Sequence, residues 1–315
     1  MIPGLDILAD CVRHHLDLDA PITLERIATG KFNTSWFVHI GDDRECVLRI
    51  APPDDNVFLF YERQMMRQEP RIHQLLLENT DVPVAPVIAF DHSRTLIDRN
   101  FILMERLRGE PISDAVHVDD AAVSFRLGQC LAQVHSQTTD RYGYIGEHRP
   151  MRPETDWTSA FRVMWGRLLD DIVGVGCYTD LQRDVLLQLL EQHIDCFDRE
   201  EPASLLHMDV WAQNILVDNG QLSGLVDWDR ALWGDPEIEF AVLEYCGVLN
   251  DAFYEGYGVR METTEAAMVR RVFYLLYEHQ KYIVIRAGRG NEPAVAESYR
   301  DDCLNMVRKT FGDVI

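Results

Sequence analysis

Apolar positions in the first hundred residues fall in short alternating runs, the pattern of half-buried β-strands. The runs cover residues 22–27, 36–40, 46–50, 84–90 and 101–107. Pro52 and Pro53 close the third run, because proline cannot donate a hydrogen bond within a sheet. A longer stretch, 62–77, predicts a helix that ends at the turn-forming residues 79–81. This part of the chain is therefore predicted to be a small, β-rich lobe.

Beyond about residue 118 the apolar positions recur every three or four residues, which predicts helices. These helices are expected over residues 119–136, 157–173, 181–197 and 264–286. Two short apolar runs, 215–217 and 222–226, interrupt the helical pattern and flank Asn219-Gly220, a strong hairpin signal. We therefore predict an α+β protein, with a larger and mainly helical second lobe that contains one hairpin.

Length and composition are those of an ordinary globular protein. The 315 residues are 47% hydrophobic, enough for one large domain or two lobes that share a cleft. Apolar stretches are too short to cross a bilayer, and the N-terminus lacks the pattern of a signal peptide. Seven scattered cysteines with no CxxC pair argue against a disulfide framework and a structural zinc site. A cytoplasmic location is expected.

A formal charge of −22 argues against nucleic acids and anionic membranes as partners. The acidity has three explanations that the sequence leaves open. A solvated acidic surface is favoured over attraction of a polycationic substrate, and a high-salt habitat is the third.

Polar residues cluster around the predicted hairpin. Asp209 and Asn214 lie five residues apart before its first strand, and Asp227 and Asp229 follow its second. Because hairpin pairing brings the two ends together, Asp209, Asn214 and Asp227 are expected to converge on one site. Carboxylate and amide oxygens are the ligands that Mg²⁺ prefers. Phosphoryl transfer requires such metal ions and a carboxylate that orients the attacking hydroxyl, so the pattern predicts a phosphotransferase.

The stretch 206–241 resembles the aminoglycoside phosphotransferase family, which includes choline kinase-like and fructosamine kinase-like enzymes and shares the protein-kinase fold. The resemblance implies that Asp209 is the catalytic base, while Asn214 and Asp227 bind magnesium ions. It implies structural roles for His207, which holds the catalytic loop, and for Asp235, which braces that loop from the following helix.

The first lobe carries further matches to this family. Residues 30–35 resemble the nucleotide-positioning loop, in which backbone N–H groups and short hydroxyls bond phosphate oxygens. Arg49 stands at the position of the phosphate-binding lysine, and Glu69 at that of its ion-pair partner. Backbone groups near Glu105 and Leu107 would bond the purine. The resemblance thus implies a nucleotide site formed by Gly30, Asn33, Thr34, Ser35, Arg49, Glu69, Glu105 and Leu107.

Three residues depart from the family pattern. Met208 replaces a glycine, Arg49 replaces a lysine, and Glu239 replaces an aspartate. Arginine keeps the positive charge of lysine but presents a planar fork of donors in place of a single point donor.

The resemblance implies a bilobal, protein-kinase-like fold, with an N-terminal nucleotide-binding lobe over 1–104 and a C-terminal helical lobe over 105–315. The expected reaction transfers the γ-phosphoryl group of ATP, or of GTP, to a hydroxyl of a small acceptor, with Mg²⁺ as cofactor. An aminoglycoside is one candidate acceptor. The alternatives are another sugar, an amino alcohol or a macrolide. The state of assembly, monomer or homodimer, stays open.

Other functional classes fit the sequence less well. A protein kinase would need an activation loop, but Asp227-Trp228-Asp229 leads directly into Gly234-Asp235-Pro236. A metal-dependent hydrolase leaves the lobe organisation unexplained, and a catalytically silent nucleotide-binding protein would not need Asp209, Asn214 and Asp227 together. The walls of the acceptor pocket are predicted to include Asp156, Trp157, Glu244, Glu278 and Tyr282.

Overall fold

The computed structural model describes residues 3–17, 19–28, 32–42, 44–116 and 118–314. The chain forms two compact units. Unit 1 contains Met1–Asn56, Gln64–Val123 and Ala212–Asp229, and unit 2 contains Val57–Arg63, Ser124–Trp211 and Arg230–Ile315. The N-terminal region is rich in strands and the C-terminal region is mainly helical, so the predicted α+β class is confirmed. The predicted lobe boundary after residue 104 stays a prediction.

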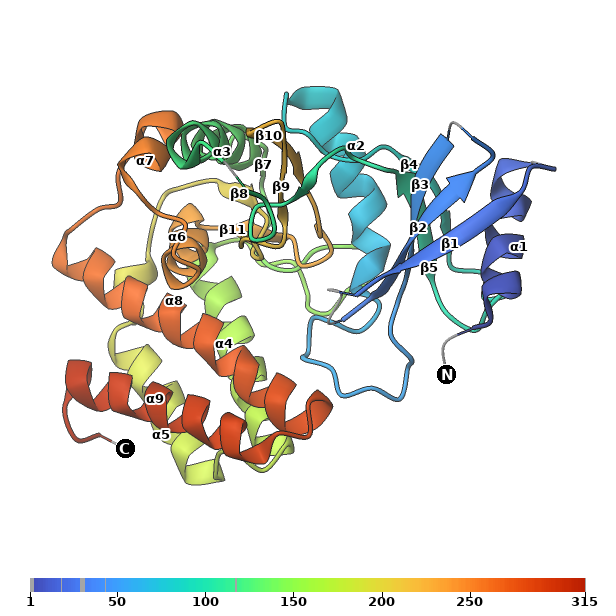
Figure 1. Cartoon of the computed structure of the whole chain (residues 1–315). Helices are drawn as coiled ribbons and strands as arrows, with labels where there is room; N and C mark the ends of the chain where they lie inside the picture. The colour runs from blue at the N-terminus through green and yellow to red at the C-terminus, as the bar shows by residue number, and fades with distance from the viewer. Residues whose placement is uncertain (1–2, 18, 29–31, 43, 117, 315) are drawn as a thin grey trace. The chain divides into compact units, whose positions relative to one another are not determined.

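Unit 1 is built on a five-stranded antiparallel sheet (Figure 1). Its spatial order is β1-β2-β3-β5-β4. The strands are β1 (Ile22–Ile27), β2 (Thr34–Ile40), β3 (Arg44–Ile50), β4 (Val87–Asp91) and β5 (Phe101–Glu105). Each of these strands was predicted. β4 begins three residues later than expected, and Pro86, which has no N–H group, directly precedes it.

Alternation along β3 explains how the sheet buries both faces. Cys46, Leu48 and Ile50 pack on one face with helix α1 (Leu5–Leu16). Val47 faces the other way, into a cluster with Met66. Successive side chains of a strand point to opposite faces, so Arg49 lies on the same face as Val47.

The predicted helix over 62–77 is wrong in its first part. The structure has a 3₁₀ turn, η1 (Met65–Gln68), followed by helix α2 (Glu69–Asn79). Gln64 has φ 61°, a left-handed conformation that an α-helix cannot contain. Pro70 stands in the first turn of α2, where proline is favoured, so it marks a helix start.

The Asn219-Gly220 hairpin is confirmed. Strands β9 (Ile215–Asp218) and β10 (Gln221–Leu225) pair antiparallel, and β6 (Glu110–Pro111) joins β9 on its other side. Asn219 and Gly220 both have positive φ, 51° and 75°, as the tight hairpin turn requires. The hairpin belongs to unit 1, although the surrounding sequence belongs to unit 2.

Unit 2 is organised around helix α8 (Glu265–Val284), which contacts α4 (Trp157–Gly174), α6 (Pro236–Tyr245) and α9 (Pro293–Phe311). Unit 2 also contains α5 (Asp180–Gln192), α7 (Asp251–Tyr257) and most of α3 (Asp120–His135). The predicted helix 181–197 ends earlier, and a 3₁₀ turn, η2 (Ile194–Phe197), follows it. A π-helical turn (Ile285–Arg289) extends α8.

A small sheet and an aromatic core complete unit 2. The sheet has the order β11-β8-β7, with β7 (Thr138–Thr139), β8 (Ala203–Leu206) and β11 (Leu232–Gly234). In the core, the Phe161 ring stacks on Phe197 at 4.9 Å, and Phe273 packs edge-on to Trp165 at 5.5 Å. These contacts join α4, η2 and α8. Strand β8 leads into His207.

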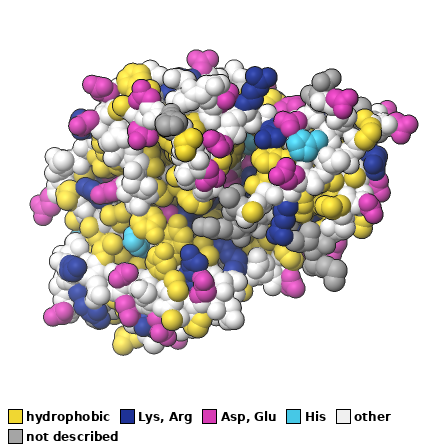
Figure 2. Space-filling model, in the orientation of Figure 1, with side chains coloured by type: hydrophobic (Ala, Val, Ile, Leu, Met, Phe, Trp, Pro, Cys, Tyr) yellow, Lys and Arg dark blue, Asp and Glu magenta, His cyan; other side chains and the backbone are white. Residues whose placement is uncertain are grey.

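No helix within the described residues is long and apolar enough to span a membrane. On the visible face in Figure 2, acidic side chains are scattered and interspersed with basic ones. This scatter is typical of a solvated acidic surface.

The segment Val57–Arg63 follows β3 in sequence but packs within unit 2. The Phe60 N–H group donates to Asp171 Oδ2 at 2.7 Å, and the Tyr61 ring stacks on Tyr144 at 4.6 Å. Glu62 forms an ion pair with Arg289 at 3.0 Å. Burial raises the pKa of Asp171 to about 6, although the Phe60 hydrogen bond partly opposes the shift.

The raised pKa of Asp171 predicts a pH-dependent stability. The folded state takes up this proton near pH 6 and the unfolded state near pH 3.9, so the contribution to stability is present at low pH and lost as pH rises through about 6. Asp171→Asn keeps an oxygen acceptor for Phe60 but carries no charge. We expect its thermal midpoint to exceed that of the wild type at pH 7.5 and the difference to vanish at pH 4. The exposed neighbour Asp170→Asn is the control, and a midpoint difference that does not change with pH would contradict the expectation.

Candidate active site

The turn that carries Asp209 follows β8 and has an unusual backbone. Met208 has φ 66° and is fully buried. A left-handed conformation costs a side-chain-bearing residue about 1 kcal/mol, and glycine avoids this cost. The methionine here therefore adopts a strained turn that a glycine would form without strain.

Glu239, from α6, holds this turn. Its Oε2 accepts the His207 N–H group at 3.0 Å, and its Oε1 accepts the Met208 N–H group. The Asp209 N–H group donates to His207 Nδ1 at 3.3 Å. Arg230 donates to the Met208 carbonyl oxygen. Each backbone group of Met208 thus has a buried charged partner, which offsets the strain of the left-handed turn.

Glu239 is itself supported from α3 and α7. His135 Nε2 lies 2.8 Å from Glu239 Oε2, and His135 Nδ1 lies 2.7 Å from the Tyr257 hydroxyl. Burial raises the pKa of Glu239, but the hydrogen bond and charge of His135 outweigh burial and lower it overall. Glu239 therefore stays ionised, as an acceptor of two N–H groups must.

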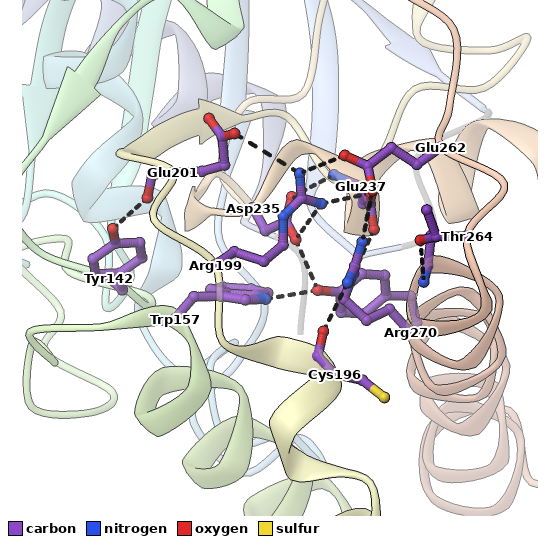
Figure 3. Close-up of polar contacts among 12 residues, drawn as sticks. Tyr142, Trp157, Cys196, Arg199, Glu201, Asp235, Glu237, Glu262, Thr264 and Arg270 are labelled. Carbon is purple, nitrogen blue, oxygen red and sulfur yellow. Dashed lines mark hydrogen bonds and ion pairs between the residues drawn. The ribbon is translucent and has the colours of Figure 1, made fainter.

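Asp235, predicted to brace the loop, contacts other elements. It caps α6 by accepting the Glu237 N–H group at 3.0 Å, and Tyr274 donates its hydroxyl to Asp235 at 3.1 Å. Figure 3 shows it within a network of ion pairs with Arg199, Glu237 and Arg270. Burial raises the pKa of Asp235, and Arg199 partly opposes this shift. The direct contact with the backbone of 207–208 comes from Glu239.

Two buried cations flank Asp209, and the sequence reasoning missed both. Arg230 Nη1 lies 4.0 Å and Lys281 Nζ 3.9 Å from Asp209 Oδ1. Glu278, only 1% exposed, pairs with Arg230 at 2.9 Å and also with Lys281. Asp209 itself keeps 31% of its side chain exposed. A weak signal was available, because Lys281 follows Glu278 by three residues, a spacing at which side chains on a helix meet.

Unit 1 holds a second charged cluster around Arg49. Its guanidinium donates to Glu69 at 2.6 Å, to Asp229 at 2.9 Å and to Asp227. Asn33 donates to the same Asp229 oxygen at 2.7 Å. A planar fork can serve three carboxylates at once, which a lysine ammonium does less well. The predicted pair of Arg49 and Glu69 is therefore present, and Asp229, unassigned from the sequence, joins it.

The pKa values of Asp229 and Glu69 in this cluster shift in opposite directions. Burial and the neighbouring charge of Asp227 raise the pKa of Asp229 well above its usual value. Burial also raises the pKa of Glu69, but the charge of Arg49 outweighs it and lowers the pKa overall. Glu69 is therefore ionised and forms a stable ion pair with Arg49.

Asn214 and Asp227 stand at the open end of the hairpin. The Val226 N–H group donates to the Asn214 carbonyl oxygen at 3.1 Å, which brings the two chain segments together. Asp227 has φ 73°, another left-handed position at a proposed functional residue. The donor set, one amide and one carboxylate, fits a hard cation such as Mg²⁺. Within the described residues, no three or more His, Cys, Asp and Glu side chains are placed together to hold a metal.

The other predicted nucleotide residues are placed as follows. Gly30 lies outside the described residues. Thr34 and Ser35 begin β2, and Ser35 pairs with Arg49 across the sheet. The Glu105 N–H group donates to the Pro86 carbonyl oxygen at 2.9 Å, and Leu107 packs against the cluster that contains Met104.

The predicted wall residues of the acceptor pocket have diverse environments. Asp156 caps α4 by accepting the Ser159 N–H group at 2.7 Å. Trp157 is buried and donates to the Tyr274 hydroxyl at 2.6 Å, so it serves packing. Glu244 pairs with Arg271. Tyr282 stacks on Tyr299 at 5.2 Å and lies 4.8 Å from Lys281 Nζ. Of this set, Glu278 and Tyr282 adjoin the group around Asp209.

Comparison with known proteins identifies the family. The model of the phosphotransferase enzyme family matches residues 23–269, well over half of the chain. The chain therefore belongs to this family and is an enzyme, a small-molecule phosphotransferase with an alcohol group as acceptor. The family resemblance inferred from the sequence is confirmed.

The names of individual relatives indicate different acceptor molecules. The chain is 28% identical over 265 residues to a protein of Vibrio parahaemolyticus named "Probable ketoamine kinase", covering 80% of this chain and 83% of the relative. It is 34% identical over 77 residues to hygromycin-B 4-O-kinase of Escherichia coli, covering 24% of this chain and 20% of the relative.

Solved structures support the fold. A crystal structure from Haemophilus somnus, described as a candidate fructosamine-3-kinase, has a TM-score of 0.70 at 18% identity and covers 94% of this chain and 96% of its own. A mutant of aminoglycoside phosphotransferase APH(4)-Ia, in a ternary complex with AMP-PNP and hygromycin B, has a TM-score of 0.65 at 19% identity. The match covers 96% of this chain and 99% of the mutant's chain. The protein-kinase-like fold is thereby confirmed.

The Arg49 cluster predicts a large loss of stability for Arg49→Met. The change leaves Glu69 and Asp229 buried without their cation, which costs about 3 kcal/mol of unfolding free energy. Urea denaturation measures this loss. Arg44→Met, which breaks the exposed pair with Glu105, is the control and should cost less than about 1 kcal/mol. Equal losses for the two variants would show that the Arg49 cluster does not stabilise unit 1.

The contact between Met208 and Glu239 predicts energetic coupling. Glu239→Gln replaces one acceptor by an amide group that faces an N–H donor, at a cost of about 2 kcal/mol. With methionine at 208, loosening of the turn releases about 1 kcal/mol of strain that offsets part of this cost, and with glycine there is no strain to release, so the same change should cost about 1 kcal/mol more. A double-mutant cycle with Met208→Gly in urea denaturation measures the difference. The control cycle pairs Met208→Gly with Glu244→Gln, on the same helix, and should be additive. Additivity in both cycles would contradict the coupling.

Proposed function

We propose that this enzyme transfers the γ-phosphoryl group of ATP to a hydroxyl group of a ketoamine, a sugar joined to an amine. The likeness to the Vibrio ketoamine kinase supports this acceptor because it extends over 80% of the chain. The nucleotide is proposed from the family, and GTP is an alternative donor.

The environment of Asp209 supports phosphoryl transfer most directly. Its carboxylate is partly exposed, while the turn beneath it is held by Glu239 and flanked by Arg230 and Lys281. A general base needs a fixed position and access to its proton donor. In the proposed reaction Asp209 orients the acceptor hydroxyl and takes its proton. His207 keeps the turn in place through its contact with the Asp209 N–H group.

Unit 1 supplies the residues proposed for the nucleotide. Arg49, held by Glu69, would steady the phosphates, and the start of β2 with Asn33, Thr34 and Ser35 would lie along them. Asn214 and Asp227 would hold Mg²⁺, which neutralises phosphate charge when bound. Arg49 now donates to Asp227, so a metal at Asp227 would have to replace that contact. We propose residues 1–104 as the nucleotide-binding lobe and 105–315 as the acceptor-binding lobe.

An aminoglycoside is the second candidate acceptor. The 34% identity to hygromycin-B 4-O-kinase favours it, but this match spans only 24% of the chain. Both candidates present hydroxyl groups beside amines, so the acceptor assay must include one of each.

The function is tested with purified protein, Mg²⁺ and ATP, and two acceptors, a fructosyl amine and hygromycin B. Mass spectrometry follows the gain of one phosphate by the acceptor, and formation of the nucleoside diphosphate, ADP, is followed in parallel. We expect transfer to the fructosyl amine. Formation of ADP at the same rate without any acceptor would instead favour a hydrolase.

Asp209→Asn should lower the transfer rate about 10³-fold, because it removes the general base. Nucleotide affinity, measured by calorimetry, should change little. Asp170→Asn, an exposed aspartate on α4, is the control and should behave as the wild type. Unchanged transfer in Asp209→Asn would contradict the assignment of the base.

A further inference from the structure

Lys281 is a buried lysine in a chain that has only three. The others are Lys31, outside the described residues, and Lys309, which is exposed on α9. Lys281 is 5% exposed, and its ammonium group contacts Glu278 and lies 3.9 Å from Asp209 Oδ1. Burying an ammonium group costs free energy unless it is paired. The buried position of Lys281 beside the proposed base therefore suggests a functional role.

The distance between Lys281 Nζ and Asp209 Oδ1 suits a shared third atom. At 3.9 Å it is too long for a direct hydrogen bond, yet shorter than two hydrogen bonds of about 2.8 Å placed end to end. One oxygen atom can therefore accept from Nζ and donate to Oδ1 at the same time. An ammonium group has three donors, so the contact with Glu278 leaves capacity for such an oxygen.

Arg230 fits this role less well, although it lies at a similar distance from Asp209. Its Nη1 already donates to the Met208 carbonyl oxygen, and its Nη2 donates to Glu278. Glu278 thus pairs with both cations and holds the Lys281 ammonium group. Arg230 Nη1 keeps a second N–H group, but these two contacts hold the planar guanidinium in one orientation, whereas the Lys281 ammonium group can rotate a remaining donor toward a group next to Asp209.

We propose that Lys281 is a catalytic residue that donates a hydrogen bond to the acceptor hydroxyl oxygen. This inference rests on the proposed function. Asp209 takes the hydroxyl proton while the oxygen forms its bond to the γ-phosphorus. The bond from that phosphorus to the β–γ bridging oxygen breaks, and its electron pair leaves with the nucleoside diphosphate. Lys281 stabilises the negative charge that develops on the attacking oxygen, and burial strengthens this interaction.

The first test compares Lys281→Met with the wild type and with Lys309→Met. Methionine keeps the length and much of the volume of the lysine side chain but has no donor. Loss of one fixed donor of this kind lowers kcat about 10²- to 10³-fold. We expect this loss in Lys281→Met, with little change in nucleotide affinity, and none in Lys309→Met. A kcat within about twofold of the wild type overturns the proposal.

A second variant separates catalysis from charge balance. If Lys281 served only to neutralise Glu278, then Lys281→Met would have no further effect in a Glu278→Gln background, where Arg230 has lost its carboxylate partner in either case. We expect Lys281→Met to lower kcat about 10²-fold in that background as well, whereas Lys281→Arg in the wild type should recover part of the activity by presenting a donor. Equal kcat values for Glu278→Gln and the double variant would overturn the catalytic role and leave a structural one.

The outcome for Lys281 is distinguishable from that for the proposed function. If the wild type phosphorylates an acceptor and Lys281→Met does so equally fast, only the Lys281 proposal fails. If the wild type phosphorylates neither acceptor but hydrolyses ATP, water is the attacking hydroxyl. The same variants are then compared by phosphate release, with the same expected loss. If the wild type transfers phosphate to nothing, both proposals fail.

Discussion

The hydrogen bonds from two adjacent N–H groups to the Glu239 carboxylate hold the turn on which the proposed chemistry depends. They fix His207 and Met208 in a backbone conformation that a methionine does not favour, and so set the direction of Asp209. Two departures from the family pattern, Met208 and Glu239, are therefore in direct contact. The longer glutamate side chain spans both N–H groups, and its own partner, His135, keeps it ionised.

Charge compensation follows the same logic in both units. In unit 1, Arg49 donates hydrogen bonds to three carboxylates. In unit 2, Glu278 forms ion pairs with Arg230 and Lys281. In each case a buried charge is tolerated because several partners share it. In the proposed reaction these groups have two functions. Arg49 and Lys281 balance buried carboxylates, and they would also contact the phosphates and the attacking hydroxyl. Such sites are sensitive to the loss of any single partner.

Local signals explain which features could be predicted from the sequence. The Asn219-Gly220 turn, the alternating strands and the pairing of Arg49 with Glu69 each have a short-range or family signature. The start of α2 was missed because the left-handed Gln64 has no marker in the sequence. The roles of Arg230 and Lys281 were missed because their contacts join residues far apart in the chain, Asp209 to α8 among them. Tertiary packing alone creates these contacts.

Phosphoryl transfer to a small hydroxylated acceptor accounts for both charged clusters together. Phosphorus NMR of the wild-type protein with Mg²⁺, ATP and a fructosyl amine tests it most directly, because donor, product and free phosphate give separate signals. The account predicts a new phosphate monoester signal that grows in step with nucleoside diphosphate. Growth of free phosphate alone, with no ester signal from the fructosyl amine or from hygromycin B, would contradict it.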